Sequence, residues 1–183
     1  TIALHPISCG KNWGLGSKVP AQTGNVVISL KKLNRILEYN ETLAYVRVEP
    51  GVTQGMLYDF LEEKKSSLIL STTGSSPSAS VIGNVLERGD GTGLYGERAD
   101  YVCGFEVVLP SGEVITPGFT RYKNTQLASL SDSDLGPSLQ NLFCQSNLGI
   151  VTQMTLWLEP ISSHNGCVLF NVNSKEKIPG LIQ

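Results

Sequence analysis

The chain lacks long hydrophobic runs and clusters of positive charge. Its 183 residues contain no apolar stretch near the roughly 20 residues that a membrane helix needs. No charged-then-apolar signal peptide is found at Thr1. The 14 Lys and Arg residues are scattered and the formal net charge is −2, whereas nucleic acids and anionic membranes attract clustered positive charge. We therefore expect neither nucleic acid nor a membrane as a partner.

Cysteine is scarce, and its spacing argues against a metal site. Cys9, Cys103, Cys144 and Cys167 form no C-x-x-C pair and have no pair of histidines nearby. A zinc site is therefore not expected. Four widely separated cysteines are typical of reduced thiols in a reducing compartment, so we predict a cytoplasmic protein. Cys9 is the exception to note, because it lies inside a glycine-rich segment that is described below.

Strand and helix patterns alternate without a regular βαβ order, which predicts an α+β fold with mixed sheets flanked by helices. Between 43 and 49 the side chains of Ala44, Val46 and Val48 face one way, as in a half-buried strand. Thr53 is a suitable N-cap for a helix that runs to about residue 65. The other expected strands are 26–30, 102–109, 113–115, 149–158 and 167–172; the other expected helices are a brief turn at 31–37, a short helix from 81 and one at 137–144; 116–136 is expected to be a polar loop.

The segment from Pro6 to Ser17 is the strongest functional signal. It holds three glycines, two serines, an asparagine and a lysine directly after a short apolar start. Glycine permits positive φ and close approach of a ligand to the main chain, and consecutive free amides form an anion-binding concavity. The order of residues matches neither the phosphate-binding loop of NTPases nor G-x-G-x-x-G. The segment therefore predicts either a diphosphate cradle or a structural turn.

Two further segments carry similar signals. Between Thr72 and Gly91 a run of small hydroxyl residues leads into Val81-Ile-Gly-Asn84, where we expect a helix whose first amides are unpaired and open to an anion or a polar edge. The alternative is a flexible serine-rich loop. Between Phe143 and Thr152, Gly149 opens a strand and marks close approach of another backbone or of a flat ligand, or else a plain turn.

Taken in order, these segments resemble the FAD-binding domain of the flavoprotein family that includes vanillyl-alcohol oxidase and the flavoprotein subunit of p-cresol methylhydroxylase (PCMH). The resemblance covers the chain from His5 to Pro160. It is carried by His5–Ser17, Ser80–Gly89, Leu94–Gly96, Gly104–Glu113 and Gln145–Thr152.

The resemblance implies FAD as cofactor, with the first segment around its diphosphate. Pro50 and Gly51 are expected near the site. By this correspondence, cofactor-binding residues are Ser8, Cys9, Gly10, Lys11, Asn12, Gly14, Gly16, Ser17, Gly74, Ser80, Val81, Gly83, Asn84, Gly149, Ile150 and Val151. Some members attach the flavin through a histidine in the first segment. Asn12 takes that position here, so this linkage is not expected, and His5 is expected to be a strand-end residue.

The resemblance also implies a domain organisation and an activity. Residues 1–160 correspond to the FAD-binding domain without its first portion, and 161–183 to a linker and the first element of a substrate (cap) domain, so that the domain is expected to be truncated at both ends. The implied function is oxidation of an alcohol or phenolic small molecule, bound through the cap domain, by hydride transfer to flavin N5. No catalytic residue is assigned, and an oligomer is compatible with the sequence. The alternatives are an FAD-domain scaffold with an empty site, and an enzyme that binds UDP-sugar or NAD in the same cradle; NAD is disfavoured by the missing G-x-G-x-x-G.

Overall fold

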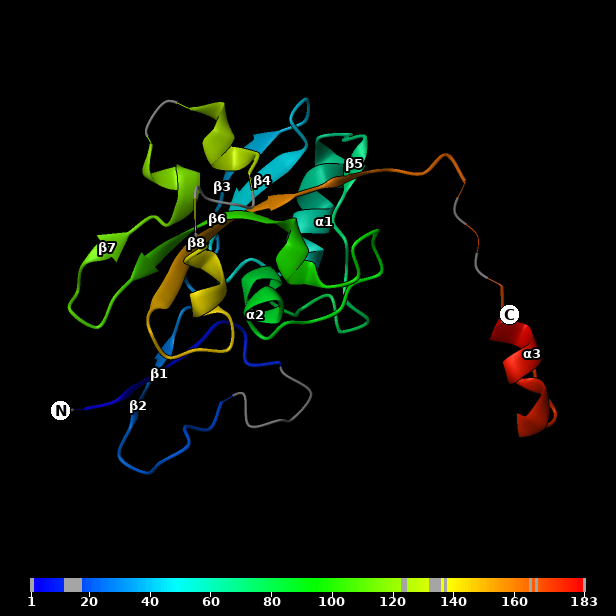
Figure 1. Cartoon of the computed structure of the whole chain (residues 1–183), viewed down its shortest axis with the longest axis horizontal. Helices are drawn as coiled ribbons and strands as arrows, with labels where there is room; N and C mark the ends of the chain where they lie inside the picture. The colour runs from blue at the N-terminus through cyan, green and yellow to red at the C-terminus, as the bar shows by residue number, and fades with distance from the viewer. Residues whose placement is uncertain are drawn as a thin grey trace.

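A five-stranded antiparallel sheet, ordered β3-β4-β8-β6-β7, forms the centre of the computed structural model (Figure 1). The structure describes residues 2–11, 18–122, 125–131, 136, 138–164, 166 and 168–182. The strands of this sheet are β3 (Ile36–Asn40), β4 (Tyr45–Val48), β6 (Val102–Val108), β7 (Val114–Ile115) and β8 (Ile150–Trp157). Two strand pairs flank it: the parallel β1 (Leu4–Ile7) and β2 (Val26–Ser29), and the antiparallel β5 (Leu68–Ile69) and β9 (Glu159–Pro160).

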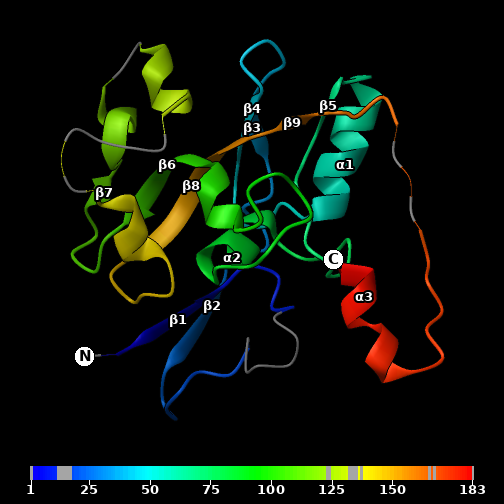
Figure 2. The ribbon, with the colours of Figure 1, turned by 45° about the vertical axis from the view of Figure 1, so that its right-hand side comes forward.

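Two helices cover one face of the central sheet. Helix α1 (Gln54–Glu63) begins at Thr53, whose hydroxyl accepts from the Met56 amide, and the shorter α2 (Val81–Leu86) begins at Ser80. Figure 2 shows both helices on the same side, whereas the 3₁₀ turns Gly118–Arg121 and Gln126–Ser129 lie on the other side. Apolar side chains between the sheet and the helices make the core, among them Val46, Val48, Leu57, Val85, Val107, Met154 and Leu156.

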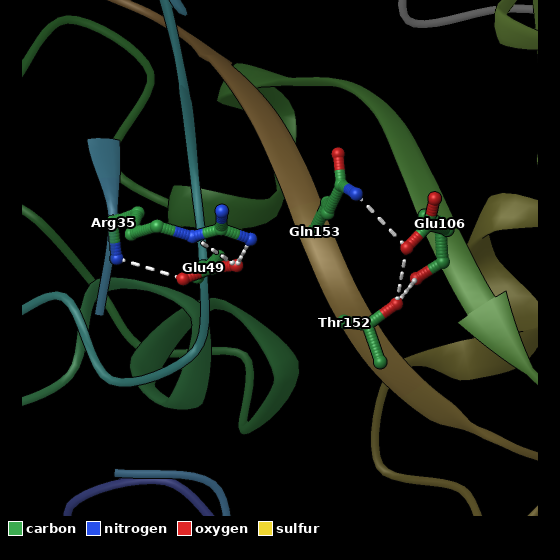
Figure 3. A network of polar contacts seen from close by, with 5 residues as sticks. All are labelled: Arg35, Glu49, Glu106, Thr152 and Gln153. Carbon is green, nitrogen blue, oxygen red and sulfur yellow. Dashed lines mark hydrogen bonds and ion pairs between the residues drawn. The ribbon is translucent and has the colours of Figure 1, made fainter. Parts of the chain in front are cut away.

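The opposite face of the sheet carries hydrogen-bonded polar side chains (Figure 3). Glu106 on β6 accepts hydrogen bonds from the Thr152 hydroxyl at 2.8 Å and from the Gln153 amide at 3.0 Å. Glu106 pairs with Gln153 but Val107 pairs with Val151, so Thr152 is an extra residue in β8. This bulge explains why both Val151 and Met154 face the core, although strict alternation would place two residues three positions apart on opposite faces.

Most of the expected elements are confirmed, including the strands at 26–30, 43–49 and 149–158 and the helix after Thr53. The helical turn expected at 31–37 is wrong: β3 begins at Ile36, and Arg35 is held to Glu49 through backbone and side-chain bonds. The helix expected at 137–144 is a 3₁₀ turn, Gln140–Phe143. The strand expected at 167–172 is not found among its described residues, 168–172.

After β9 the chain leaves the sheet. Figure 1 shows this segment leading away from the sheet toward α3 (Pro179–Ile182), and in Figure 2 it passes α1 on the way. The 3₁₀ turn Lys175–Lys177 precedes α3. Within the described ranges, none of the helices combines the length and the apolar character needed to cross a membrane.

Candidate functional site

Three segments far apart in the sequence line an open cavity of about 590 Å³. They are β1 with the residues after it, α2 with the residues before it, and the stretch from Phe143 into β8. A volume of this size is typical of small-molecule and cofactor sites. The wall consists of His5–Lys11, Leu30, Pro50, Ser75, Ala79, Ser80, Ile82–Asn84, Leu86, Glu87, Phe143, Gln145–Asn147 and Gly149–Val151.

Most of the cofactor-binding residues predicted from the sequence are brought together in this wall. They are Ser8, Cys9, Gly10, Lys11, Ser80, Gly83, Asn84, Gly149, Ile150 and Val151. Gly74 and Val81 are not among the described lining residues, and the Val81 side chain is fully buried in the core. Asn12, Gly14, Gly16 and Ser17 lie outside the described residues, so their predicted contacts stay predictions.

Close contacts between the three segments fix the shape of the cavity. Gly83 of α2 lies so near Ser8 that a Cβ at position 83 would collide with the Ser8 hydroxyl. The Gln145 amide donates to the Leu86 carbonyl at 2.8 Å, which ties the third segment to the end of α2. At Gly149 an added Cβ would lie 3.1 Å from the Val108 carbonyl oxygen, as expected for close approach of a second backbone.

Ser80 organises the start of α2. Its hydroxyl donates to the Pro50 carbonyl at 2.7 Å and accepts from the Gly83 amide at 2.9 Å, and the Val81 amide donates to the Val52 carbonyl at 3.0 Å. The sequence predicted free amides at this helix start. That expectation is wrong for Val81 and Gly83, because an N-cap and a neighbouring loop use both amides.

The segment Ser8–Lys11 presents mainly backbone groups and an uncharged thiol to the cavity. Gly10 has φ +61°, a conformation that glycine adopts at little cost. Burial raises the pKa of the Cys9 thiol, an effect that the ammonium groups of Lys31 and Lys11 partly offset. The thiol donates weakly to the Gly51 carbonyl. Cys9 is therefore uncharged at neutral pH, which removes a source of repulsion for an anionic ligand.

The serine-rich segment before α2 is anchored by a buried amide. Gln54 accepts from the Thr73 amide at 2.9 Å and from Arg98 Nη1 at 3.2 Å, and its own amide donates to the Ser76 carbonyl at 3.4 Å. Burial lowers the pKa of Arg98 to about 10, so this guanidinium is charged at neutral pH. These bonds hold the segment that brings Ser75 to the cavity, which argues against the flexible-loop alternative.

Two polar atoms of the wall are left without a partner. Asn84 Oδ1 and His5 Nε2 are buried and have no hydrogen-bond partner among the described residues. A buried polar atom without a partner costs about 1–3 kcal/mol. Both atoms belong to residues that line the same cavity. A ligand with polar groups could therefore supply the hydrogen bonds that the described residues do not.

The sequence missed part of this wall. His5 was expected to end a strand, but it lies within β1 and lines the cavity. Pro50, named from the resemblance as a neighbour of the site, is in the wall. Ser75, Ala79, Phe143 and the Gln145–Asn147 turn lie in segments that carried a signal, but none of them was named as a cofactor-binding residue. Only the fold shows which residues of these segments reach the cavity. The positive φ of Gln145 (49°) could not be read from its side-chain type.

Comparison with known proteins identifies the domain. The family described as "FAD binding domain" matches residues 1–118. The chain belongs to this family of FAD-binding domains. A 1'-carboxy-chondrochloren decarboxylase of Chondromyces crocatus is 48% identical over 177 residues, which are 97% of this chain and 33% of that protein.

Solved structures give the same result for the fold. The FAD-binding domain matches a substrate-bound crystal structure of p-cresol methylhydroxylase with a TM-score of 0.83 and 39% identity, over 87% of this chain and 31% of that one. A structure of a 4-ethylphenol oxidase from Gulosibacter chungangensis, in complex with isoeugenol, matches with a TM-score of 0.85 and 40% identity. That match covers 89% of this chain and 31% of the oxidase chain. The fold is thus a PCMH-type α+β FAD-binding domain, FAD is its cofactor, and the chain spans about a third of the length of the proteins it matches.

The residues present fit this cofactor. FAD carries a diphosphate that suits main-chain amides and lysine, and it carries donors and acceptors on its rings and ribityl chain. The Ser8–Lys11 segment would hold the diphosphate, because its glycine backbone and Lys11 line the wall and its thiol is neutral. Asn84 Oδ1, which can only accept, would bind an N–H or O–H group of FAD and not the diphosphate.

Proposed function

We propose that residues 1–160 are the FAD-binding domain of an FAD-linked oxidoreductase that oxidises an alcohol or a phenolic small molecule. The observation that carries the proposal is the FAD cavity, together with identities of 39% and 40% to proteins named p-cresol methylhydroxylase and 4-ethylphenol oxidase. When bound, FAD accepts a hydride at N5. The residues of this chain hold the cofactor, and Gln54 and Arg98 keep one wall in place.

We propose further that residues 161–183 lie outside this domain, as a linker and the first element of a substrate-binding cap domain. Val168, Leu169 and Phe170 support this division, since their side chains are 71%, 93% and 69% exposed. Three neighbouring apolar residues with so much exposed surface are typical of a segment that packs against another part of a protein. Substrate binding through the cap domain, and any oligomer, belong to the same proposal.

The test uses the full-length protein loaded with FAD and kept free of oxygen. Addition of a 4-alkylphenol or a benzylic alcohol is expected to bleach the oxidised flavin absorbance, whereas an alkylbenzene without a hydroxyl group is expected to leave it unchanged. An FAD-loaded protein that none of the alcohols or phenols reduces would favour the alternative, a scaffold that binds FAD without turnover.

A second candidate reaction is decarboxylation. It is favoured by the 48% identity, over nearly the whole chain, to a protein named as a decarboxylase. Carboxylated phenols therefore belong in the same panel, with released CO₂ measured beside flavin absorbance. CO₂ release from these substrates, without reduction by simple phenols or alcohols, would support decarboxylation over oxidation of an alcohol or phenol.

A further inference from the structure

Unpartnered polar atoms are concentrated at the FAD cavity. Within the described ranges, three buried side-chain nitrogen or oxygen atoms have no hydrogen-bond partner: His5 Nε2, Arg47 Nε and Asn84 Oδ1. Two of the three belong to residues that line this one cavity. Most buried polar groups in folded proteins are paired, so an unpaired one at a binding site points to a missing ligand.

His5 is held in place by the parallel strand pair. It lies in the middle of β1, opposite Val27 of β2 in the register of the pair. The chain then continues directly into Ser8, Cys9, Gly10 and Lys11, which line the same cavity. His5 therefore comes three residues before the segment that would hold the diphosphate, on a strand paired with β2.

Asn84 approaches the cavity from α2. Its side-chain amide packs against Gly89, where an added Cβ would collide with it, and the Gly89 amide donates to the Asn84 carbonyl at 2.9 Å. This packing limits the rotation of the Asn84 side chain. The cavity is thus flanked by two polar groups from different elements, an imidazole and an amide oxygen.

We infer that His5 is an FAD-binding residue whose Nε2 makes a hydrogen bond to the dinucleotide. The inference rests on the proposed FAD site and adds a residue that the sequence had assigned to a strand end. The ring, ribityl and phosphate groups of FAD include both donors and acceptors, and a neutral imidazole can donate or accept at Nε2. The hydrogen bond pairs a nitrogen that is otherwise buried without a partner.

Substitution tests the contribution to affinity. FAD is titrated into the chain, with flavin fluorescence as the readout, for His5→Leu, His5→Gln and the matched control His164→Leu in the exposed segment after β9. Loss of one hydrogen bond predicts about tenfold weaker binding for His5→Leu. His5→Gln places a side-chain nitrogen near the position of Nε2 and is expected to restore most of the affinity. His164→Leu is expected to bind like the wild type.

An NMR measurement on the wild type tests the contact between His5 and FAD without any substitution. The chain has only two histidines, His5 and His164. After labelling with ¹⁵N-histidine, addition of FAD is expected to shift the Nε2 resonance of His5 and to leave that of His164 in place. This measurement uses the wild type, so it decides the question even where His5→Leu does not fold.

The outcomes separate the two proposals. FAD that binds without a shift of the His5 resonance, and with equal affinity in His5→Leu, overturns the role of His5 and leaves the FAD site intact. Failure of the wild type to bind FAD overturns both. A shift at His5 together with weaker binding in His5→Leu, restored in His5→Gln, supports the inference.

Discussion

Glu49 is a buried carboxylate at the end of β4, next to the turn that brings Pro50 to the cavity. Its side chain is 4% exposed, whereas that of its partner Arg35 is 73% exposed. Arg35 Nη2 donates to Glu49 Oε1 at 2.7 Å, and the Arg35 amide donates to Oε2 at 2.8 Å. These bonds and the positive charge of Arg35 lower the pKa of Glu49 against the opposing effect of burial.

The ion pair predicts a pH-dependent loss of stability in Arg35→Met. A carboxylate with a lowered pKa in the folded state stabilises the fold above its ordinary pKa of about 4.3, and this contribution is lost as the pH falls through the lowered pKa. We expect Arg35→Met to melt several degrees below the wild type at pH 7, and the difference to shrink below about pH 4. Exposure of Arg35 to solvent keeps the effect moderate.

Thermal melting between pH 3 and pH 7 checks this expectation. Lys177→Met, which removes an exposed cation from the segment after β9, serves as the control and is expected to melt like the wild type. A difference between Arg35→Met and the wild type that stayed constant over the whole range would show that Glu49 ionisation is not involved.

At the scale of elements, the N-cap of α2 links helix stability to the cavity. Ser80 and Thr53 cap α2 and α1 in the same way, each accepting from the amide three residues on. Only Ser80 also lines the cavity and donates to the Pro50 carbonyl. Ser80 and Thr53 therefore form a matched pair for substitution, because both cap a helix and only Ser80 lines the cavity.

We expect Ser80→Ala to destabilise the fold by about 1–3 kcal/mol, because it loses the cap and leaves a buried carbonyl without its partner. Thr53→Ala should cost about 0.5–2 kcal/mol for its cap alone. Urea unfolding measures both losses. FAD titration distinguishes the two variants, since only Ser80→Ala should bind FAD more weakly. Equal affinities in the two variants would show that the Ser80 hydroxyl does not shape the site.

Much of this arrangement could be predicted from local sequence patterns, and the exceptions have physical reasons. Val46 and Val48 alternate with polar residues, so their strand was evident. Residues 31–37 carry apolar side chains at helical spacing, yet Arg35 is hydrogen-bonded to Glu49, a residue 14 positions away, and β3 begins directly after it. Here a tertiary contact outweighs a local preference, which periodicity alone does not reveal.

For the site too, local patterns and resemblance identified some residues, whereas tertiary contacts brought in others. Gly10, Ser80 and Gly83 were predicted as cofactor-binding residues from the family resemblance, within segments that residue type had marked as a turn and a helix start. His5 and Gln145 were not, because they reach the cavity only where segments far apart in the sequence meet, as Gln145 meets Leu86. Gly74 was also predicted, but it is not among the described lining residues, so its contact with the cofactor stays a prediction.

At the scale of the whole molecule, FAD would bind where three distant segments meet. β1, α2 and the stretch before β8 contact one another through Ser8 with Gly83 and through Gln145 with Leu86. A ligand that binds only this folded arrangement stabilises it by mass action. We therefore expect this chain to take up FAD in the cavity.

The most direct test of that claim is FAD uptake, measured from the visible flavin spectrum after removal of free FAD, in the wild type, Gly10→Val and Gly112→Val. Both glycines have positive φ, +61° and +86°, so valine strains either backbone, but only Gly10 lines the cavity. We predict flavin bands for the wild type and Gly112→Val, and at least about tenfold weaker binding for Gly10→Val, since even 1.4 kcal/mol of strain or displacement corresponds to a factor of ten. A wild type without flavin, or a Gly10→Val variant that binds FAD as well as Gly112→Val, would show that the chain does not hold FAD at the Gly10 segment of this cavity.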